Sequence, residues 1–323
     1  MTDLRPKPAT RPAGSGEKPP AEPRIGLRAR FSRIDAAWSP YLFIAPFFVI
    51  FAIFGLFPLG YTAWVSLHDW DISGAGAFVG FDNYATLFAD PDFWNAVYNT
   101  IGILVLATVP QLLFALVLAS LLNQKLRGLT FLRMGVLLPI VTSVAAVGIV
   151  FSQIFDRDAG AVNGLLGLVN IDPVDWRADK WSSWTAIATM VNWRWTGYNA
   201  LIYLAAMQSI PRDLYEAATV DGASKARQFW SITVPLIRPA LIFTVIVSTI
   251  AGMQLFTEPL IFGQGTFAIS GGSLRQFQTV SMYMFEKAFR DFDYGYGSAV
   301  AWMIFLLITV LAVINFLITR KGK

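Results

Sequence analysis

Polar side chains stand inside two otherwise apolar stretches of the chain, near residues 183–207 and 239–262. The candidates for contact with a solute are Tyr198, Asn199, Gln254 and Glu258. Polar and charged groups are costly inside a long apolar stretch, so each is a candidate for function. An aromatic ring beside amides and a carboxylate suits a sugar, because the C–H faces of a sugar pack on rings and its hydroxyls need hydrogen-bond donors and acceptors. These four residues therefore predict a path for a sugar.

The charges in the same stretches also allow a structural interpretation. Arg194 lies in the first stretch and Glu258 in the second. The two could pair with each other, or with a sister subunit, and hold helices together instead of touching a solute. The sequence leaves both interpretations open.

Several kinds of chemistry are missing from the sequence. It has no cysteine and a single histidine, His68, which excludes thiolate sites and the usual multi-histidine metal site. It contains neither a G-x-x-x-x-G-K-S/T string for phosphate binding nor an H-E-x-x-H string for zinc. An intramembrane enzyme is therefore poorly supported. We expect no catalytic residue, metal or cofactor site in this chain.

The composition indicates a protein solvated by lipid. Apolar residues make up 55% of the sequence and charged residues 14%, against about 25% charged in soluble domains. Apolar runs suited to a bilayer core recur along the chain. They fall near 41–67, 97–122, 134–155, 183–207, 239–262 and 297–319. The sequence thus predicts an all-α polytopic membrane protein, in which residues 39–323 form one transmembrane domain of six helices.

Lys and Arg are distributed unevenly over the segments between these runs. Eighteen fall on the side that holds both termini and the loops 123–133 and 208–238, and six fall on the other side. Cytoplasmic loops carry the excess of Lys and Arg, so both termini are predicted to be cytoplasmic. This topology explains the net charge of +4, and we expect membrane lipid, not nucleic acid, as a partner.

The N-terminal residues 1–38 differ from the rest of the chain. Six prolines among Gly, Thr, Lys and Arg fall within the first 24 residues, which leaves too little apolar surface to offset the entropy cost of ordering. We expect a disordered cytoplasmic tail there. From Gly26 to Asp35, basic residues alternate with apolar ones, which fits either an amphipathic segment on the membrane surface or a solvated linker.

Aromatic side chains gather near the predicted outer ends of the spans. They are Trp70, Phe81, Tyr84, Phe93, Trp94, Trp176, Trp181 and Trp184. Amphipathic rings prefer the headgroup layer, so this set predicts anchors at the lipid interface, with a ligand-stacking platform as the alternative.

The segment after the fourth run has strong local signals for two short helices. Pro211 and Asp213 suit a first helical turn, and Gly222 supplies a helix stop. Ser224 is a good N-cap for a second helix. The expected product is a cytoplasmic helix-turn-helix with an apolar face. That face could enter the groove of a partner, or it could pack under the protein's own helices.

The same segment resembles a known signature. It contains Glu216-Ala217-Ala218, three residues further Gly222 after Asp221, and nine residues later Ile-Thr-Val-Pro235. This string resembles the "EAA" motif of permease subunits in ATP-binding-cassette importers, with Val234 where the pattern has Leu. The resemblance implies that this helix-turn-helix is the coupling loop that docks on a separate ATPase. It assigns the ATPase contact to Glu216, Ala217, Ala218, Asp221, Gly222 and Pro235.

Other strings resemble the sugar-importer branch of this family. They are Phe78-Val-Gly-Phe-Asp-Asn-Tyr84, Phe93 to Thr100, Leu126 to Arg133 and Tyr283 to Tyr296. The stretches 254–261 and 275–280 are similar to actinobacterial permeases for disaccharides such as cellobiose. The family implies a bacterial inner or plasma membrane, a second permease in a heterodimer, two ATP-binding subunits that bind ATP and Mg, and an extracellular solute-binding protein.

The resemblance also implies a mechanism. Closure of the ATPase dimer on ATP would move the permease between inward-open and outward-open states through the docked helix. The alternative class is a secondary transporter or channel that works without an ATPase. A copurifying ATPase subunit would discriminate between the two.

Overall fold

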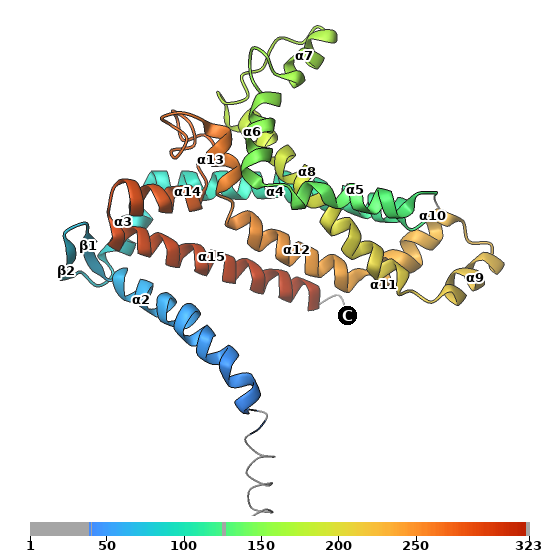
Figure 1. Ribbon diagram of the computed structural model, residues 1–323, viewed down its shortest axis with the longest axis horizontal. Coiled ribbons are helices and arrows are strands. Elements are labelled where there is room, and N and C mark those ends of the chain that lie inside the picture. The colour runs from blue at the N-terminus through green and yellow to red at the C-terminus, as the bar shows by residue number, and fades with distance from the viewer. Residues whose placement is uncertain (1–38, 40, 125–126, 321–323) are drawn as a thin grey trace, which may run out of the picture. The chain divides into compact units, whose positions relative to one another are not determined.

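The computed structural model describes residues 39, 41–124 and 127–320 (Figure 1). The tail expected at residues 1–38 lies outside these described residues. The chain divides after Leu59 into two units, which we describe separately. In the first unit, a helix runs from Tyr41 and includes the π-helical segment η1 (Ala52–Leu56).

The second unit is helical except for one hairpin. In chain order its elements are α2 (Phe57–Val65, which begins in the first unit), β1 (His68–Asp71), β2 (Gly74–Phe78), α3 (Asp82–Ala89), α4 (Pro91–Leu122), α5 (Leu129–Val141), α6 (Val144–Ile154), α7 (Ala161–Leu168), α8 (Lys180–Gln208), α9 (Arg212–Val220), α10 (Lys225–Gln228), η2 (Phe229–Thr233), α11 (Val234–Leu236), α12 (Arg238–Met253), α13 (Thr257–Gly263), α14 (Val280–Phe285), η3 (Glu286–Arg290) and α15 (Tyr294–Arg320). The α9–α10 end lies opposite the end formed by α3, α14 and the hairpin (Figure 1).

The hairpin was not expected from the sequence. β1 and β2 pair antiparallel with His68 opposite Phe78. His68 is buried, and its Nδ1 lies 2.8 Å from the carbonyl oxygen of Trp64. The histidine therefore serves to close the end of α2 onto the hairpin.

Three helices of the described chain are long and apolar enough to cross a membrane. They are Tyr41–Val65, α4, and Tyr294–Leu317 within α15. Two bent pairs qualify in combination: α5 with α6 at 91°, and Lys225–Leu236 with α12 at 65°. α8 has 29 residues, but its many polar residues lower its hydropathy. The all-α polytopic class is confirmed, and the count of six spans remains a prediction.

Two predicted spans are broken in the structure, which corrects the expectation of single helices. The run 134–155 consists of α5 and α6, because Thr142 and Ser143 between them adopt extended backbone angles. The run 239–262 stops as a helix at Met253, and α13 begins at Thr257. Apolar composition locates such runs but does not reveal a break, since Thr, Ser and Gln also occur inside helices.

The core of the second unit forms where α8 lies against its neighbours. A Cβ atom at Gly102 of α4 would collide with the ring of Trp184 on α8. In the same way, a Cβ atom at Gly197 of α8 would collide with the backbone carbonyl of Val136 on α5. Small residues let helix backbones approach this closely. α8 is therefore held between α4 and α5, and its side chains are fixed in position.

Two of the predicted interfacial aromatic residues belong to the core instead. Trp184 and Phe93 are buried, and the Trp184 Nε1 donates a hydrogen bond to the Gln276 carbonyl at 3.0 Å. Trp94 and Trp181 are exposed, as expected for anchors. The correction has a physical reason: a ring near the end of a span can face the bundle as well as the lipid, and the sequence does not distinguish the two faces of such a helix.

Candidate functional site

The helix that carries the Glu216-Ala217-Ala218 string is α9, which forms where the local signals predicted it. Asp213 lies in its first turn, where a carboxylate complements the helix dipole. Its end is a Schellman motif: Ala223 N–H donates to the Ala218 carbonyl at 2.8 Å, and Gly222 N–H donates to the Thr219 carbonyl at 3.1 Å. Gly222 has a φ of +75°, which favours glycine.

The second short helix begins at its predicted cap. The Ser224 hydroxyl accepts a hydrogen bond from Arg227 N–H at 3.3 Å, and α10 follows. Side chains then join the two helices: the Gln228 amide donates to the Thr219 hydroxyl at 3.0 Å, and the hydroxyls of Tyr215 and Thr233 lie 2.8 Å apart. These bonds fix α9 against the segment that leads into α12.

The residues predicted to contact an ATPase lie mostly on the free surface of this hairpin. Glu216, Ala217, Asp221, Gly222 and Pro235 are exposed, and Ala218 is half-buried. The apolar face is divided. Tyr215 and Phe229 pack toward the chain's own core, whereas Leu214 and Trp230 are 44% and 64% exposed. The structure thus combines both interpretations of the apolar face, and the docking role remains a prediction.

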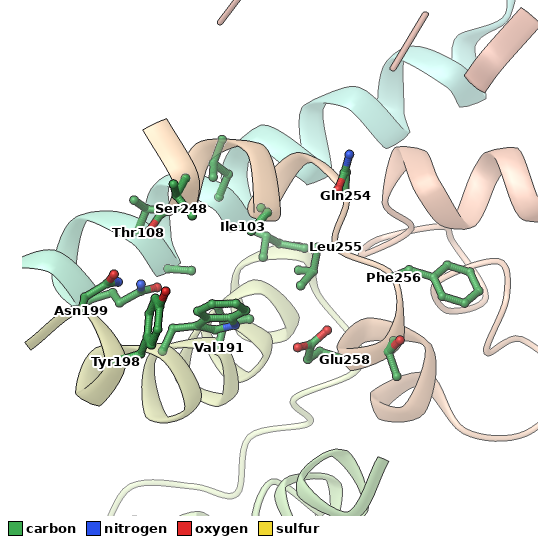
Figure 2. Close-up of a pocket in the computed structure, with 18 residues that line it drawn as sticks. Ile103, Thr108, Val191, Tyr198, Asn199, Ser248, Gln254, Leu255, Phe256 and Glu258 are labelled. Carbon is green, nitrogen blue, oxygen red and sulfur yellow. The ribbon is translucent and has the colours of Figure 1, made fainter. Parts of the chain in front are cut away.

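A cavity of about 270 Å³ lies between α4, α8 and α12. All four residues predicted to contact a solute line it: Tyr198 and Asn199 from α8, and Gln254 and Glu258 from the end of α12 and the start of α13 (Figure 2). Its remaining walls are mainly apolar. The structure therefore brings together residues that are separated by 55 or more positions in the chain, although it does not test their contact with a solute.

The break between α12 and α13 supplies one wall of this cavity. Gln254, Leu255 and Phe256 are not helical, and all three line the cavity. The Leu255 carbonyl accepts a hydrogen bond from the Thr279 hydroxyl at 2.6 Å. Irregular backbone is tolerated at membrane depth only where it is buried in protein or lines a cavity. Such interrupted helices often form the binding sites of transporters.

Glu258 forms an ion pair with Arg194, as one of the two interpretations of these charges expected. The Arg194 Nη1 lies 2.6 Å from the Glu258 Oε1, and the two side chains are 12% and 8% exposed. This contact joins α8 to α13. Arg194 does not line the cavity, whereas Glu258 does, so the carboxylate lies between the guanidinium and the cavity.

Two amides give the cavity unused hydrogen-bonding capacity. The Asn199 Nδ2 is buried and has no hydrogen-bond partner in the described structure. Gln111 on α4 is 2% exposed, lines the cavity, and makes no side-chain hydrogen bond among the described residues. We did not single out Gln111 from the sequence. The available signal was an amide inside an apolar run, directly after Pro110.

A second group of charges, which sequence reasoning also missed, lies at the other end of the unit. Glu286 is buried and accepts hydrogen bonds from Arg275, Gln278 and Ser270 at 2.6 to 2.8 Å. Arg275 also pairs with Asp92 at 3.1 Å. Burial acts to raise the pKa of Glu286, but the hydrogen bonds outweigh it and the pKa is lowered. This network ties the loop before α14 to α4 and η3.

A helical bundle with a polar cavity at a broken helix defines a membrane transport subunit. Residues 93–321 match the family model described as "Binding-protein-dependent transport system inner membrane component". The chain belongs to this family.

Two relatives cover most of the chain. The lactose transport system permease protein LacF of Rhizobium radiobacter is 36% identical over 290 residues, which is 88% of this chain and 94% of the relative. The arabinooligosaccharides transport system permease protein AraP of Halalkalibacterium halodurans is 32% identical over 286 residues, with 88% of each chain covered. Among solved structures, a bacterial ABC transporter involved in the import of the acidic polysaccharide alginate is similar in fold. It matches with a TM-score of 0.76 at 22% identity, over 90% of this chain and 98% of that chain.

Proposed function

We propose that this chain is a membrane-spanning permease subunit of an ABC importer for a sugar or oligosaccharide, with a disaccharide such as cellobiose as the expected size of solute. The observation that carries the proposal is the cavity at the α12–α13 break. Tyr198 contributes an aromatic face, and Asn199, Gln111 and Gln254 contribute amides. Hydroxyls both donate and accept hydrogen bonds, so they match this mixture of groups.

The relatives support the same class of solute. LacF is named for lactose and AraP for arabinooligosaccharides. A saccharide of one to a few rings also suits the size of the cavity, since small-molecule sites bury most of the ligand surface. The family description, which specifies binding-protein-dependent transport, supports delivery of the solute by an external binding protein.

The proposal includes partners that bind the energy source. ATP and Mg would be bound by two separate ATPase subunits, and a second, different permease would complete the membrane pathway. α9 would dock on an ATPase through the surface around Glu216 and Ala217. Both termini would be cytoplasmic, in an inner or plasma membrane of a bacterium.

The test of the cavity is uptake of cellobiose and lactose by the assembled importer with Tyr198→Ala, Gln254→Ala or Asn199→Leu. We expect each change to reduce uptake while basal ATPase activity is retained. Asn199→Leu is the most informative, because the Asn199 Nδ2 has no partner within the described structure, so its loss removes no internal hydrogen bond from that atom. The matched control is Trp193→Ala, an exposed position of α8 that does not line this cavity.

Uptake at normal rates in all three cavity variants would contradict the proposed path. The alternative of a secondary transporter or channel predicts a different result. In that case, solute flux would persist in a membrane preparation that contains this chain without any ATPase subunit and without ATP.

A further inference from the structure

The cavity has one charged side chain in its wall. Among the described residues that line it, only Glu258 carries a charge. Figure 2 shows its carboxylate directed toward the cavity, with Tyr198 and Asn199 across from it. Most of the wall is apolar, so a charge there is poorly screened by water and acts strongly on anything that enters.

The cation that balances Glu258 is placed behind it. Arg194 donates from Nη1 to Glu258 Oε1 at 2.6 Å and is 12% exposed, but it does not line the cavity. The Arg194 Nε is buried without a hydrogen-bond partner in the part of the chain that the structure describes, and no second carboxylate pairs with this guanidinium among those residues. The charge of Arg194 therefore depends on Glu258 alone for compensation.

This order of charges has a consequence for what the cavity can accept. A solute in the cavity meets a carboxylate oxygen first, and the guanidinium is already occupied. A hydroxyl can donate a hydrogen bond to that oxygen. A carboxylate or phosphate group can only accept, so it would meet a like charge at short range and lose its hydration without gaining a cation.

We propose that the Arg194–Glu258 pair sets the charge selectivity of the cavity, so that it takes uncharged, hydroxyl-rich solutes and rejects anionic ones. The inference rests on the proposed function, since it assumes that this cavity receives the solute. Glu258 is the selecting group. Arg194 is a positioning residue, because it holds the carboxylate in place and keeps it ionised without touching the solute itself.

The experiment measures solute binding to the complete permease–ATPase complex in nanodiscs, without the external binding protein, which would impose its own choice. The probes are two matched pairs: lactose with lactobionate, and cellobiose with cellobionate. Each acid differs from its sugar by the oxidation of one end to a carboxylate. Binding is followed by saturation-transfer difference NMR, which detects weak binding.

In the wild type, we expect the neutral probe to bind at least about tenfold more tightly than its acid, as opposition by an unpaired like charge predicts. In Glu258→Gln, the freed Arg194 charge should raise the affinity for the acid by about tenfold or more while the neutral probe changes only a few-fold. The double variant Arg194→Gln with Glu258→Gln is the matched control. It removes both charges, and its affinity for the acid should lie between the other two.

The outcomes separate the two claims. If the wild type binds neither neutral probe, the proposed function fails and this inference fails with it. If the neutral probes bind and Glu258→Gln keeps the wild-type preference, the proposed function stands and the charge selectivity is wrong. A purely structural pair would alter stability and assembly but not the ratio of the two affinities. If Glu258→Gln does not assemble, a double variant with the full wild-type preference overturns the inference, and one with a reduced preference supports it.

Discussion

The hydroxyl of Tyr215 on α9 lies 2.8 Å from the hydroxyl of Thr233, the last residue of η2. Thr233 is 5% exposed, so this hydrogen bond is shielded from water. It is one of two side-chain bonds that join α9 to the segment entering α12. A movement of α9 would therefore be passed to α12, which forms one wall of the cavity.

Removing the Tyr215 hydroxyl should loosen this connection. Tyr215→Phe leaves the Thr233 hydroxyl buried with its only side-chain partner in the described structure lost, which costs about 1 kcal/mol or slightly more. We expect faster amide hydrogen exchange across α9 and a lower ratio of uptake to ATP hydrolysis. Tyr294→Phe is the control, since the Tyr294 hydroxyl makes no hydrogen bond among the described residues. Unchanged exchange across α9 would show that the bond does not hold the helix.

The turn after α9 depends on backbone conformation instead of packing. Gly222 has a φ of +75°, and an added Cβ would meet nothing within 4 Å. Gly222→Asn should keep the turn, because Asn tolerates this conformation. Gly222→Pro should destroy it, because Pro requires a φ near −65° and lacks the N–H that bonds to Thr219. We expect Gly222→Pro, but not Gly222→Asn, to abolish coupling of ATP hydrolysis to uptake in complexes that still reach the membrane.

The α9 turn was predictable from the sequence, and the cavity only in part. Gly222 and Ser224 specify their own conformation within a few residues, so local signals sufficed. The pairing of Arg194 with Glu258 needs two helices brought together over 64 positions, and the sequence offered it only as one of two interpretations. Gln111 escaped notice because a single amide in an apolar run gives no sign of which way it faces.

The breaks at Thr142 and at Gln254 to Phe256 could not be predicted for a related reason. Both lie in apolar runs of ordinary length, and nothing local forbids a helix there. Tertiary contacts decide the conformation instead, such as the hydrogen bond from the Thr279 hydroxyl to the Leu255 carbonyl. The burial of Trp184 against Gly102 likewise depends on which face of α8 meets α4.

The predicted topology can be tested directly because the chain has no cysteine. Single cysteines would be introduced at Ala223, in the α9–α10 turn, and at the exposed Ala77 in β2. The excess of Lys and Arg on one side predicts that a membrane-impermeant maleimide labels Ala77→Cys but not Ala223→Cys in intact spheroplasts, and both after permeabilisation. Labelling of Ala223→Cys from outside would reverse the orientation.

Glu286 should make stability depend on acid pH. Its pKa is lowered from the usual 4.5 in the folded protein, because the hydrogen bonds from Arg275, Ser270 and Gln278 outweigh the effect of burial. A lowered folded pKa stabilises the fold above the unfolded value, and that stabilisation is lost as the pH falls through the folded pKa. The thermal unfolding temperature of the detergent-solubilised protein should therefore drop as the pH falls below about 4.5.

Glu286→Gln should remove this component of the pH dependence. It should also lower stability at neutral pH by about 1–3 kcal/mol, because hydrogen bonds to a charged group are lost. Asp291→Asn is the control: its ion pair with Lys287 is partly exposed and should contribute less than about 1 kcal/mol. A wild-type pH profile in Glu286→Gln would assign the acid sensitivity to other carboxylates, such as Asp90, whose pKa is also lowered: its hydrogen bonds from Tyr283, Asp92 N–H and Tyr296 outweigh burial.

The contact between Gly197 and Val136 should tolerate no added atom. A Cβ at Gly197 would collide with the backbone carbonyl of Val136, so α5 and α8 must separate in Gly197→Ala. Overpacking of this kind costs about 1–3 kcal/mol. Because α8 also carries Tyr198 and Asn199, the separation would displace one wall of the cavity. We expect a lower unfolding temperature together with reduced uptake.

The matched control for Gly197→Ala is Gly135→Ala on α5, where an added Cβ meets nothing within 4 Å. Ala is favoured over Gly inside a helix by about 1 kcal/mol, so this change should leave stability equal or slightly higher. Both variants add one methyl group to the same pair of helices, and only the direction of that group differs. Equal unfolding temperatures and equal uptake in the two variants would mean that α5 and α8 do not approach as closely as described, and that the position of the cavity wall does not depend on their contact.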